Sequence, residues 1–236
     1  MFKVVKMTTI VYVLCAVVLV AALTPAFILA SRNGDAAEAF SQKTRPVIVI
    51  DAGHGGDDPG VTGVRTGVKE SDLNLKLAVT LGELLSSVGY KAVQTRMTEG
   101  STAEGAFDKD ADMRARKETI ERADPALVIS IHMNKYEGAS RRGIQVFYST
   151  NASEGFATEM QKHLNETMNV PTLGRGFEPI RGEYYIVECT EAPSVIIECA
   201  FLSNPIDEAL ITDAAYRLRL AGEIETAVKS YLSATE

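Results

Sequence analysis

Two histidines and two glutamates are placed in the sequence where they could share one site: His54, Glu70, His132 and Glu198. His54, His132 and Glu198 each follow a short apolar run, which is typical of a strand buried on both faces of a parallel sheet. Ligands of open α/β sheets bind outside the carboxyl ends of the strands, so we expect these three side chains at one edge. Glu70 lies just before a predicted helix and can return to that edge.

These residue types favour zinc chemistry. Imidazole nitrogen and carboxylate oxygen suit Zn²⁺, and two histidines with one glutamate leave a tetrahedral position open, as in catalytic zinc sites. Zinc lowers the pKa of a bound water to about 7 and polarises a carbonyl group. Glu198 could then take the proton of the water and deliver it to a leaving amine.

Spacing alone leaves structural interpretations open. A histidine at a strand end is more often a hydrogen-bonded structural residue than a ligand. Glu70 could simply stabilise a helix N-terminus, by a few tenths to about 1 kcal/mol. The glycine-rich segment 53–56 could be a turn. This segment lacks the Lys-Ser/Thr pair of a P-loop and the Gly-x-Gly-x-x-Gly spacing, which argues against nucleotide binding.

The rest of the pattern predicts an α/β fold. Strand-like and helix-like segments alternate over residues 45–236, which we interpret as a single domain with a mainly parallel twisted sheet and helices on both faces. The predicted strands cover residues 47–50, 90–95, 127–131, 143–148 and 194–197, with a short strand possible at 184–187.

The predicted helices have recognisable ends. Ser71 is a candidate N-cap, and Gly89 is suited to end the helix that follows it. Asn204 and Pro205 open another helix. Residues 171–182 are predicted as a loop. Apolar positions at helical spacing predict buried faces at Phe156, Met160, Leu164 and Met168, and at Ala215, Leu218, Ala221, Ile224, Ala227 and Tyr231.

The N-terminus differs in composition from the remainder. Lys3 and Lys6 precede an uncharged apolar stretch that runs to Ala30, which is typical of an export signal. The stretch also approaches the roughly 20 residues that span a bilayer, and its length favours a retained membrane anchor. We therefore expect residues 1–30 to be a signal peptide or anchor helix, residues 31–44 a linker, and the domain to act outside the cytoplasm.

Composition narrows the partners. The net charge is −7, which argues against general nucleic-acid binding because phosphate contacts need clustered Lys and Arg.

Cys189 and Cys199 are too few for a disulfide framework, and we interpret them as two buried thiols, although pairing stays open. His163 is expected on a helix surface. Tyr184 and Tyr185 either pack in a strand or line a substrate groove.

Four motifs in order resemble the zinc-dependent N-acetylmuramoyl-L-alanine amidases of bacterial cell walls. They are the segments Asp51–Gly60, Val68–Asp72, Ser130–Asn134 and Ile197–Asn204. The resemblance implies that His54, Glu70 and His132 bind one Zn²⁺ ion. It implies that Glu198 is the catalytic glutamate.

Further positions follow from the same resemblance. Arg116 matches an arginine of the family with no firm role, and Asn134 and Asn204 match positions that shape the site, so these three are candidate substrate-binding residues. Ala52 replaces the usual proline of the first motif. Ala200 replaces a glycine and would cost about 1 kcal/mol if its φ were positive.

The family resemblance implies hydrolysis of the amide between N-acetylmuramic acid and L-alanine in peptidoglycan. The last motif and the short chain are similar to the spore-cortex type, in which an activating lipoprotein partner can be needed. No long insertion separates Gly143 from Tyr184, so an autoinhibitory helix is not expected. The alternatives are a zinc peptidase that cuts within the stem peptide and a non-catalytic wall-binding protein.

Overall fold

The computed structural model describes residues 45–103 and 107–235. The expected signal or anchor (1–30) and linker (31–44) lie outside these residues. By its internal contacts the chain divides at Arg45, and Pro46–Glu236 forms one compact unit. Within the described ranges, no helix is long and apolar enough to cross a bilayer.

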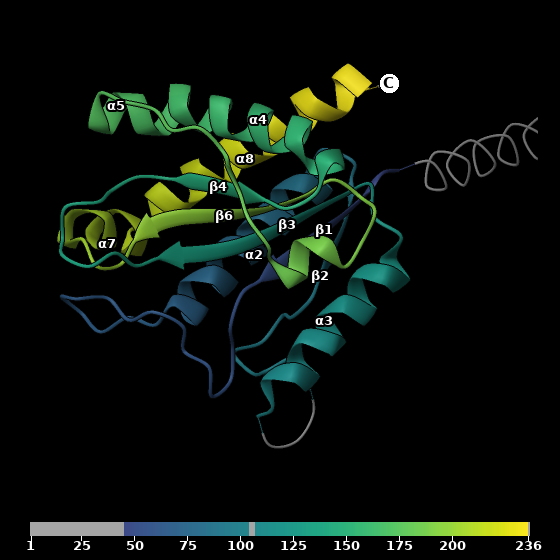
Figure 1. Ribbon diagram of the computed structural model, residues 1–236, viewed down its shortest axis with the longest axis horizontal. Helices are drawn as coiled ribbons and strands as arrows, with labels where there is room; N and C mark the ends of the chain where they lie inside the picture. The colour runs from purple at the N-terminus through teal and green to yellow at the C-terminus, as the bar shows by residue number, and fades with distance from the viewer. Residues whose placement is uncertain (1–44, 104–106, 236) are drawn as a thin grey trace, which may run out of the picture. The chain divides into compact units, whose positions relative to one another are not determined.

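A six-stranded sheet forms the centre of this unit, in the order β2-β1-β3-β6-β4-β5 (Figure 1). Four of the strand pairings are parallel, and only β4 runs antiparallel to β6. The strands are β1 (Val47–Ala52), β2 (Lys91–Gln94), β3 (Leu127–Asn134), β4 (Gln145–Tyr148), β5 (Ile180–Arg181) and β6 (Ser194–Phe201). The predicted mainly parallel α/β fold is confirmed.

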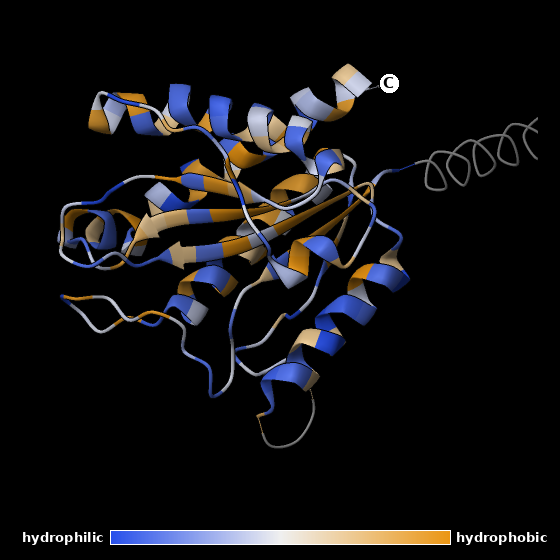
Figure 2. Cartoon of the chain, in the orientation of Figure 1, coloured by the Kyte–Doolittle hydropathy of each residue, from blue (hydrophilic) through white to orange (hydrophobic). Residues whose placement is uncertain are grey.

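Helices cover both faces of the sheet. The larger core lies between one face and the helices α2, α4 and α8, and a smaller core on the other face includes residues of α3 and α6. Figure 2 shows hydrophobic strands at the centre and hydrophilic outer helix faces. The helices are α2 (Glu70–Ser87), α3 (Lys109–Ala123), α4 (Asn151–Leu164), the π-helix η1 (Asn165–Asn169), α5 (Val170–Leu173), α6 (Tyr185–Glu188), α7 (Pro205–Thr212) and α8 (Ala214–Thr235).

The predicted strand at 184–187 is wrong, because the segment forms the short helix α6. Ile186 and Val187 are neighbours in sequence and are both buried against the smaller core. A strand would have turned one of the two side chains away, since successive side chains point to opposite faces. The edge of the sheet is instead completed by β5, within the segment predicted as a loop.

Two helix predictions also need correction. Ser71 is not the N-cap of α2, which begins one residue earlier, at Glu70. The buried face of α8 is confirmed at Ala221, Ile224 and Ala227, but Leu218 is 55% exposed. The helical spacing of apolar residues extends to the start of α8, but the buried residues of this helix begin only at Leu220.

Candidate metal centre

The loop that follows β1 holds His54 in an uncommon backbone conformation. His54 has φ 62°, in the left-handed region that residues other than glycine seldom adopt. Arg116 donates a hydrogen bond of 2.5 Å to the carbonyl oxygen of His54 from below. Surrounding contacts must hold such a conformation, and the hydrogen bond from Arg116 is one of them.

His54, Glu70 and His132 converge in the structure. One Oε1 atom of Glu70 lies 3.3 Å from Nε2 of His54 and 3.0 Å from Nδ1 of His132. The ligand atoms of the three residues lie within 4.8 Å of one another, so they could hold a metal ion. The two imidazole rings meet edge to face, with centroids 5.0 Å apart. The structure therefore brings together the three ligands predicted from the sequence.

Glu70 is held firmly at the first position of α2. Its side chain is buried and accepts hydrogen bonds from the backbone N–H groups of Val61 and Met133 and from the Asn74 amide. Burial by itself raises the pKa of Glu70, but hydrogen bonds and charge from His132 and His54 outweigh it and hold the pKa well below its usual value. Glu70 is thus ionised, as a metal ligand must be.

Asp58 and Asn74 were missed in the sequence and support this site. The Asp58 carboxylate lies 2.8 Å from Nδ1 of His54, which leaves Nε2 free to face Glu70. Such outer partners fix the orientation of ligating histidines. Burial lowers the pKa of His54, yet Glu70 and Asp58 raise it overall, so the site favours positive charge. An acid four residues after a histidine was the available sequence signal for Asp58.

Two glycines make room for the ligands. A Cβ atom at Gly53 would lie 2.2 Å from Cε1 and Nε2 of His132. A Cβ atom at Gly60, where φ is +65°, would lie 2.5 Å from Oε2 of Glu70. Both positions therefore require glycine for steric reasons.

Glu198 stands beside this cluster on the neighbouring strand. It lies opposite His132 in the parallel pairing of β3 with β6. Both strands are longer than predicted and include these two residues. Oε2 of Glu198 is buried and has no hydrogen-bond partner among the residues that the structure describes. Burial raises the pKa of Glu198 to about 7, with Glu70 adding to the rise and His132 opposing it. A carboxyl group poised near neutral pH can both accept and donate a proton.

Arg116 lies beneath the site and does not face it. Its side chain is 2% exposed and forms ion pairs of 2.8 Å with Asp51 and with Asp112. Arg96, which sequence analysis missed, lies beside it and donates hydrogen bonds to the carbonyl oxygens of Ala52 and Gly53. Substrate binding by Arg116 stays a prediction; in the structure its guanidinium group is engaged by two carboxylates and by the carbonyl oxygens of Ala52 and His54.

The two asparagines also serve the scaffold. Asn204 is the N-cap of α7, as predicted, and its side chain accepts from the N–H groups of Ile206 and Asp207 and donates to the carbonyl oxygen of Ala139. Asn134 ends β3 and accepts from its neighbour Lys135. Asn204 is 5% exposed, and substrate binding by both asparagines stays a prediction.

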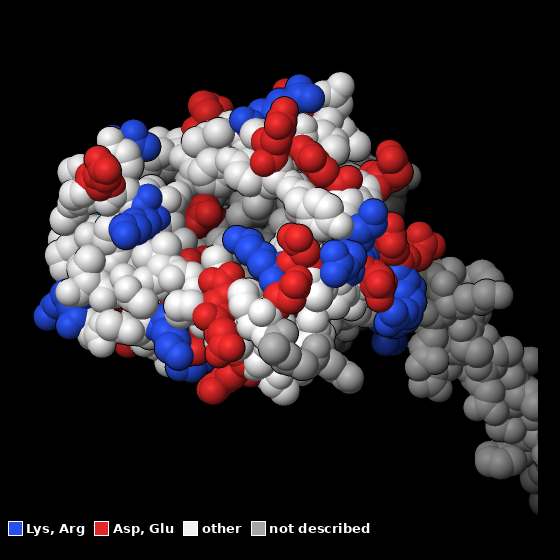
Figure 3. All heavy atoms as spheres, turned by 60° about the horizontal axis from the view of Figure 1, so that its bottom comes forward, with Lys and Arg blue, Asp and Glu red and all other residues white. Residues whose placement is uncertain are grey.

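Other sequence expectations can be settled from the described residues. Cys189 and Cys199 are both free. Ala200 lies in β6 without a positive φ, so it carries no strain there. His163 hydrogen-bonds to Glu223 on α8. Figure 3 shows acidic and basic side chains mixed around a hollowed face, and no continuous basic patch is visible on that face.

Comparison with known proteins decides the family. The family model described as N-acetylmuramoyl-L-alanine amidase matches residues 48–230. The chain belongs to this family. This membership confirms the predicted enzyme class and its reaction, hydrolysis of the amide between N-acetylmuramic acid and L-alanine in peptidoglycan.

Individual relatives agree with this assignment. The chain is 29% identical over 194 residues to the germination-specific N-acetylmuramoyl-L-alanine amidase of Bacillus subtilis, covering 79% of this chain and 80% of the relative. It is 26% identical to the amidase AmiC of Neisseria meningitidis, covering 80% of this chain but only 53% of the relative.

A solved structure gives the same result. The CwlD amidase from Clostridioides difficile, in complex with the GerS lipoprotein, matches with a TM-score of 0.74 and 30% identity, covering 80% of this chain and all of that chain. The resemblance predicted from the motifs, including the spore-cortex type, is thus confirmed at the level of family and neighbours.

Proposed function

We propose that this amidase works with Zn²⁺ held by His54, Glu70 and His132, and with Glu198 as the residue that moves the proton. The observation that carries the proposal is the unpartnered, buried Oε2 atom of Glu198 next to a cluster of three metal-ligating side chains. A buried polar atom without a partner is destabilising unless another group supplies one.

The residues present fit zinc. The cluster offers two imidazole nitrogens and one carboxylate, a donor set of catalytic zinc sites that leaves a coordination position open. When bound, Zn²⁺ lowers the pKa of water and polarises a carbonyl group. The outer contacts from Asp58 and Asn74 orient the ligands for a cation.

Glu198 has the properties of the general base and acid. In its ionised form it accepts the proton of the attacking water at Oε2. In its protonated form it donates that proton to the amine nitrogen of L-alanine as the amide C–N bond breaks. Burial raises the pKa of Glu198 to about 7, toward the neutral range that suits a general base and acid, and the charge of a bound Zn²⁺ would oppose part of that rise.

The biological setting follows from the relatives and from the N-terminal sequence. We infer that the chain is exported, acts on wall or spore-cortex peptidoglycan, and is tethered or released by its apolar N-terminal segment. One similar enzyme is named germination-specific, and the similar CwlD structure contains a lipoprotein. A lipoprotein partner is accordingly proposed as an activator.

The test is digestion of purified vegetative and spore-cortex peptidoglycan by the purified full chain, with and without Zn²⁺, followed by mass spectrometry. We expect zinc-dependent release of intact stem peptides, leaving glycan without peptide. Shortened stems would indicate the zinc peptidase instead. Zinc binding without turnover, even with a lipoprotein added, would indicate the wall-binding alternative.

The ligand set is tested separately. His132→Ala should lose bound zinc, measured by elemental analysis. His163→Ala is the matched control, because the imidazole of His163 hydrogen-bonds to Glu223 on α8 and is not part of the cluster, and it should retain zinc. Unchanged zinc content in His132→Ala would contradict the proposed ligands.

A further inference from the structure

A pocket of about 460 Å³ lies beside β4 and the end of β6. We call it the arginine pocket. It is lined by Ser140, Arg141, Arg142, Gln145, Arg175, Phe177 and Phe201. None of the described residues that line it is acidic, which is unusual in a chain of net charge −7.

The arginine pocket adjoins the proposed catalytic residue. Gln145 lines the pocket and lies opposite Glu198 in the antiparallel pairing of β4 with β6. Phe201 follows Glu198 by three residues on the same strand. At a rise of about 3.3 Å per residue, that separation is roughly 10 Å, or about the length of three extended peptide residues.

Two of the three arginines have no acidic partner in the described part of the chain. Arg142 is paired with Asp207 at 2.9 Å. Within the described part of the chain, neither Arg141 nor Arg175 has a carboxylate oxygen within 4.0 Å. Their positive charge is therefore available to a ligand.

Aromatic rings hold both of these guanidinium groups. Arg141 lies over the ring of Tyr136 at 4.1 Å, and Arg175 lies over the ring of Phe177 at 5.2 Å. Stacking of this kind restrains a long side chain, so less entropy is lost when a ligand binds.

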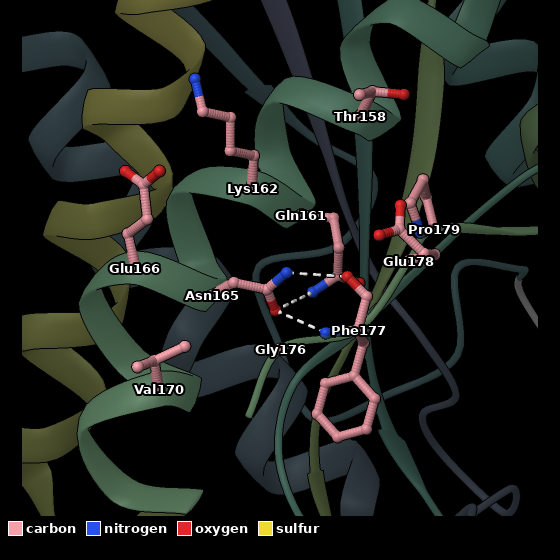
Figure 4. A pocket seen from close by; sticks show the side chains of 10 residues that line it. All are labelled: Thr158, Gln161, Lys162, Asn165, Glu166, Val170, Gly176, Phe177, Glu178 and Pro179. Atoms are coloured by element: carbon pink, nitrogen blue, oxygen red, sulfur yellow. Dashed lines mark hydrogen bonds between the residues drawn. The ribbon is translucent and has the colours of Figure 1, made fainter. Parts of the chain in front are cut away.

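The backbone of Phe177, whose ring lies under Arg175, is held by hydrogen bonds from a side chain. Asn165 of η1 donates a 2.7 Å hydrogen bond to the carbonyl oxygen of Phe177 and accepts one of 3.0 Å from its N–H group (Figure 4). Gln145 donates to the carbonyl oxygen of Glu178 next to it. Hydrogen bonds from Asn165 and Gln145 thus hold the backbone of the loop that carries Arg175.

We propose that the arginine pocket binds a carboxylate of the stem peptide, on the leaving-group side of the scissile amide. The proposal rests on the proposed function, because that reaction acts on a peptide that begins with L-alanine, and such a peptide ends in a carboxylate. Arginine forks match carboxylates in two parallel hydrogen bonds. Phe177 and Phe201 offer apolar surface to the aliphatic parts of the same residues.

The experiment measures binding without requiring turnover. Isothermal titration calorimetry compares two synthetic stem peptides that begin with L-alanine, one with free carboxylates and one with every carboxylate amidated. The proteins are the full chain, the double variant Arg141→Gln/Arg175→Gln, and Arg122→Gln as a control from the exposed end of α3.

We expect the wild type and the control to bind the acidic peptide roughly 10- to 100-fold more tightly than the amidated one. The double variant should bind both peptides equally weakly and retain zinc. Equal binding of the two peptides by the wild type, or an unchanged preference in the double variant, would overturn the proposal. Muropeptide release measured in parallel tests the proposed function separately, since a peptide preference without release would contradict only that function.

Discussion

The start of α2 and the middle of β6 each contribute a glutamate to the same site, but they surround it differently. At the start of α2, both oxygens of Glu70 accept hydrogen bonds, and its pKa is lowered although the side chain is buried. On β6, Oε2 of Glu198 has no hydrogen-bond partner within residues 45–103 and 107–235, and burial raises the pKa of Glu198 to about 7. The comparison shows that burial alone does not set the charge of a carboxylate; the donors around it do. A fixed anion suits a ligand, and a poised acid suits proton transfer.

The largest effects are expected when either glutamate is replaced by glutamine. Glu198→Gln should retain zinc and reduce kcat roughly 100- to 10,000-fold, because it removes the proton carrier. Glu70→Gln should lose zinc, because it removes an anionic ligand. Elemental analysis and muropeptide release on both variants separate these outcomes. Zinc loss in Glu198→Gln would remove the distinction between the two glutamates.

The scaffold beneath the ligands should be nearly as sensitive. Arg116→Met leaves Asp51 and Asp112 buried without their charged partner, and such a loss costs roughly 3–5 kcal/mol of unfolding free energy. Urea denaturation measures it. Arg114→Met, at an exposed position of the same helix, is the control and should change stability little. A small effect at Arg116 would show that these buried ion pairs contribute little to stability.

A smaller effect is expected at the outer contact of His54. Asp58→Asn weakens the orientation of the imidazole and should weaken zinc binding roughly 10- to 100-fold while the fold is retained. Competition with a chromogenic chelator measures the affinity. Asp57→Asn changes the exposed neighbouring carboxylate and is the matched control. Equal affinities in the two variants would show that Asp58 does not orient His54.

The mildest test uses acid. Burial raises the pKa of Asp112, but hydrogen bonds from Thr102 and Ser101 and the charge of Arg116 outweigh it and lower the pKa from 3.8 to about 2. A lowered folded-state pKa contributes stability that is present above pH 3.8 and is lost as the pH falls toward 2. Urea midpoints from pH 5 to pH 2, with a chelator present, should show this decline. Asp112→Asn should flatten it, and an equally steep decline in that variant would contradict the assignment.

Much of the architecture could be predicted locally. Apolar runs of four or five residues marked the inner strands, because a strand covered on both faces needs hydrophobic side chains throughout. The error at residues 184–187 arose where a helix of one turn and a strand have the same short apolar signature. Only packing against the smaller core distinguishes the two.

The sequence by itself determined the fold class and the family, and it predicted four candidate residues for the chemistry, because ordered motifs at strand ends are local features. Only the tertiary structure decided how they work together. It set the register that puts His132 beside Glu198, buried Arg116 against Asp51, which lies 65 positions away, and brought Arg141 and Arg175 to one pocket. Such contacts depend on strand register and loop conformation, which distant parts of the chain fix together, and no local pattern records them.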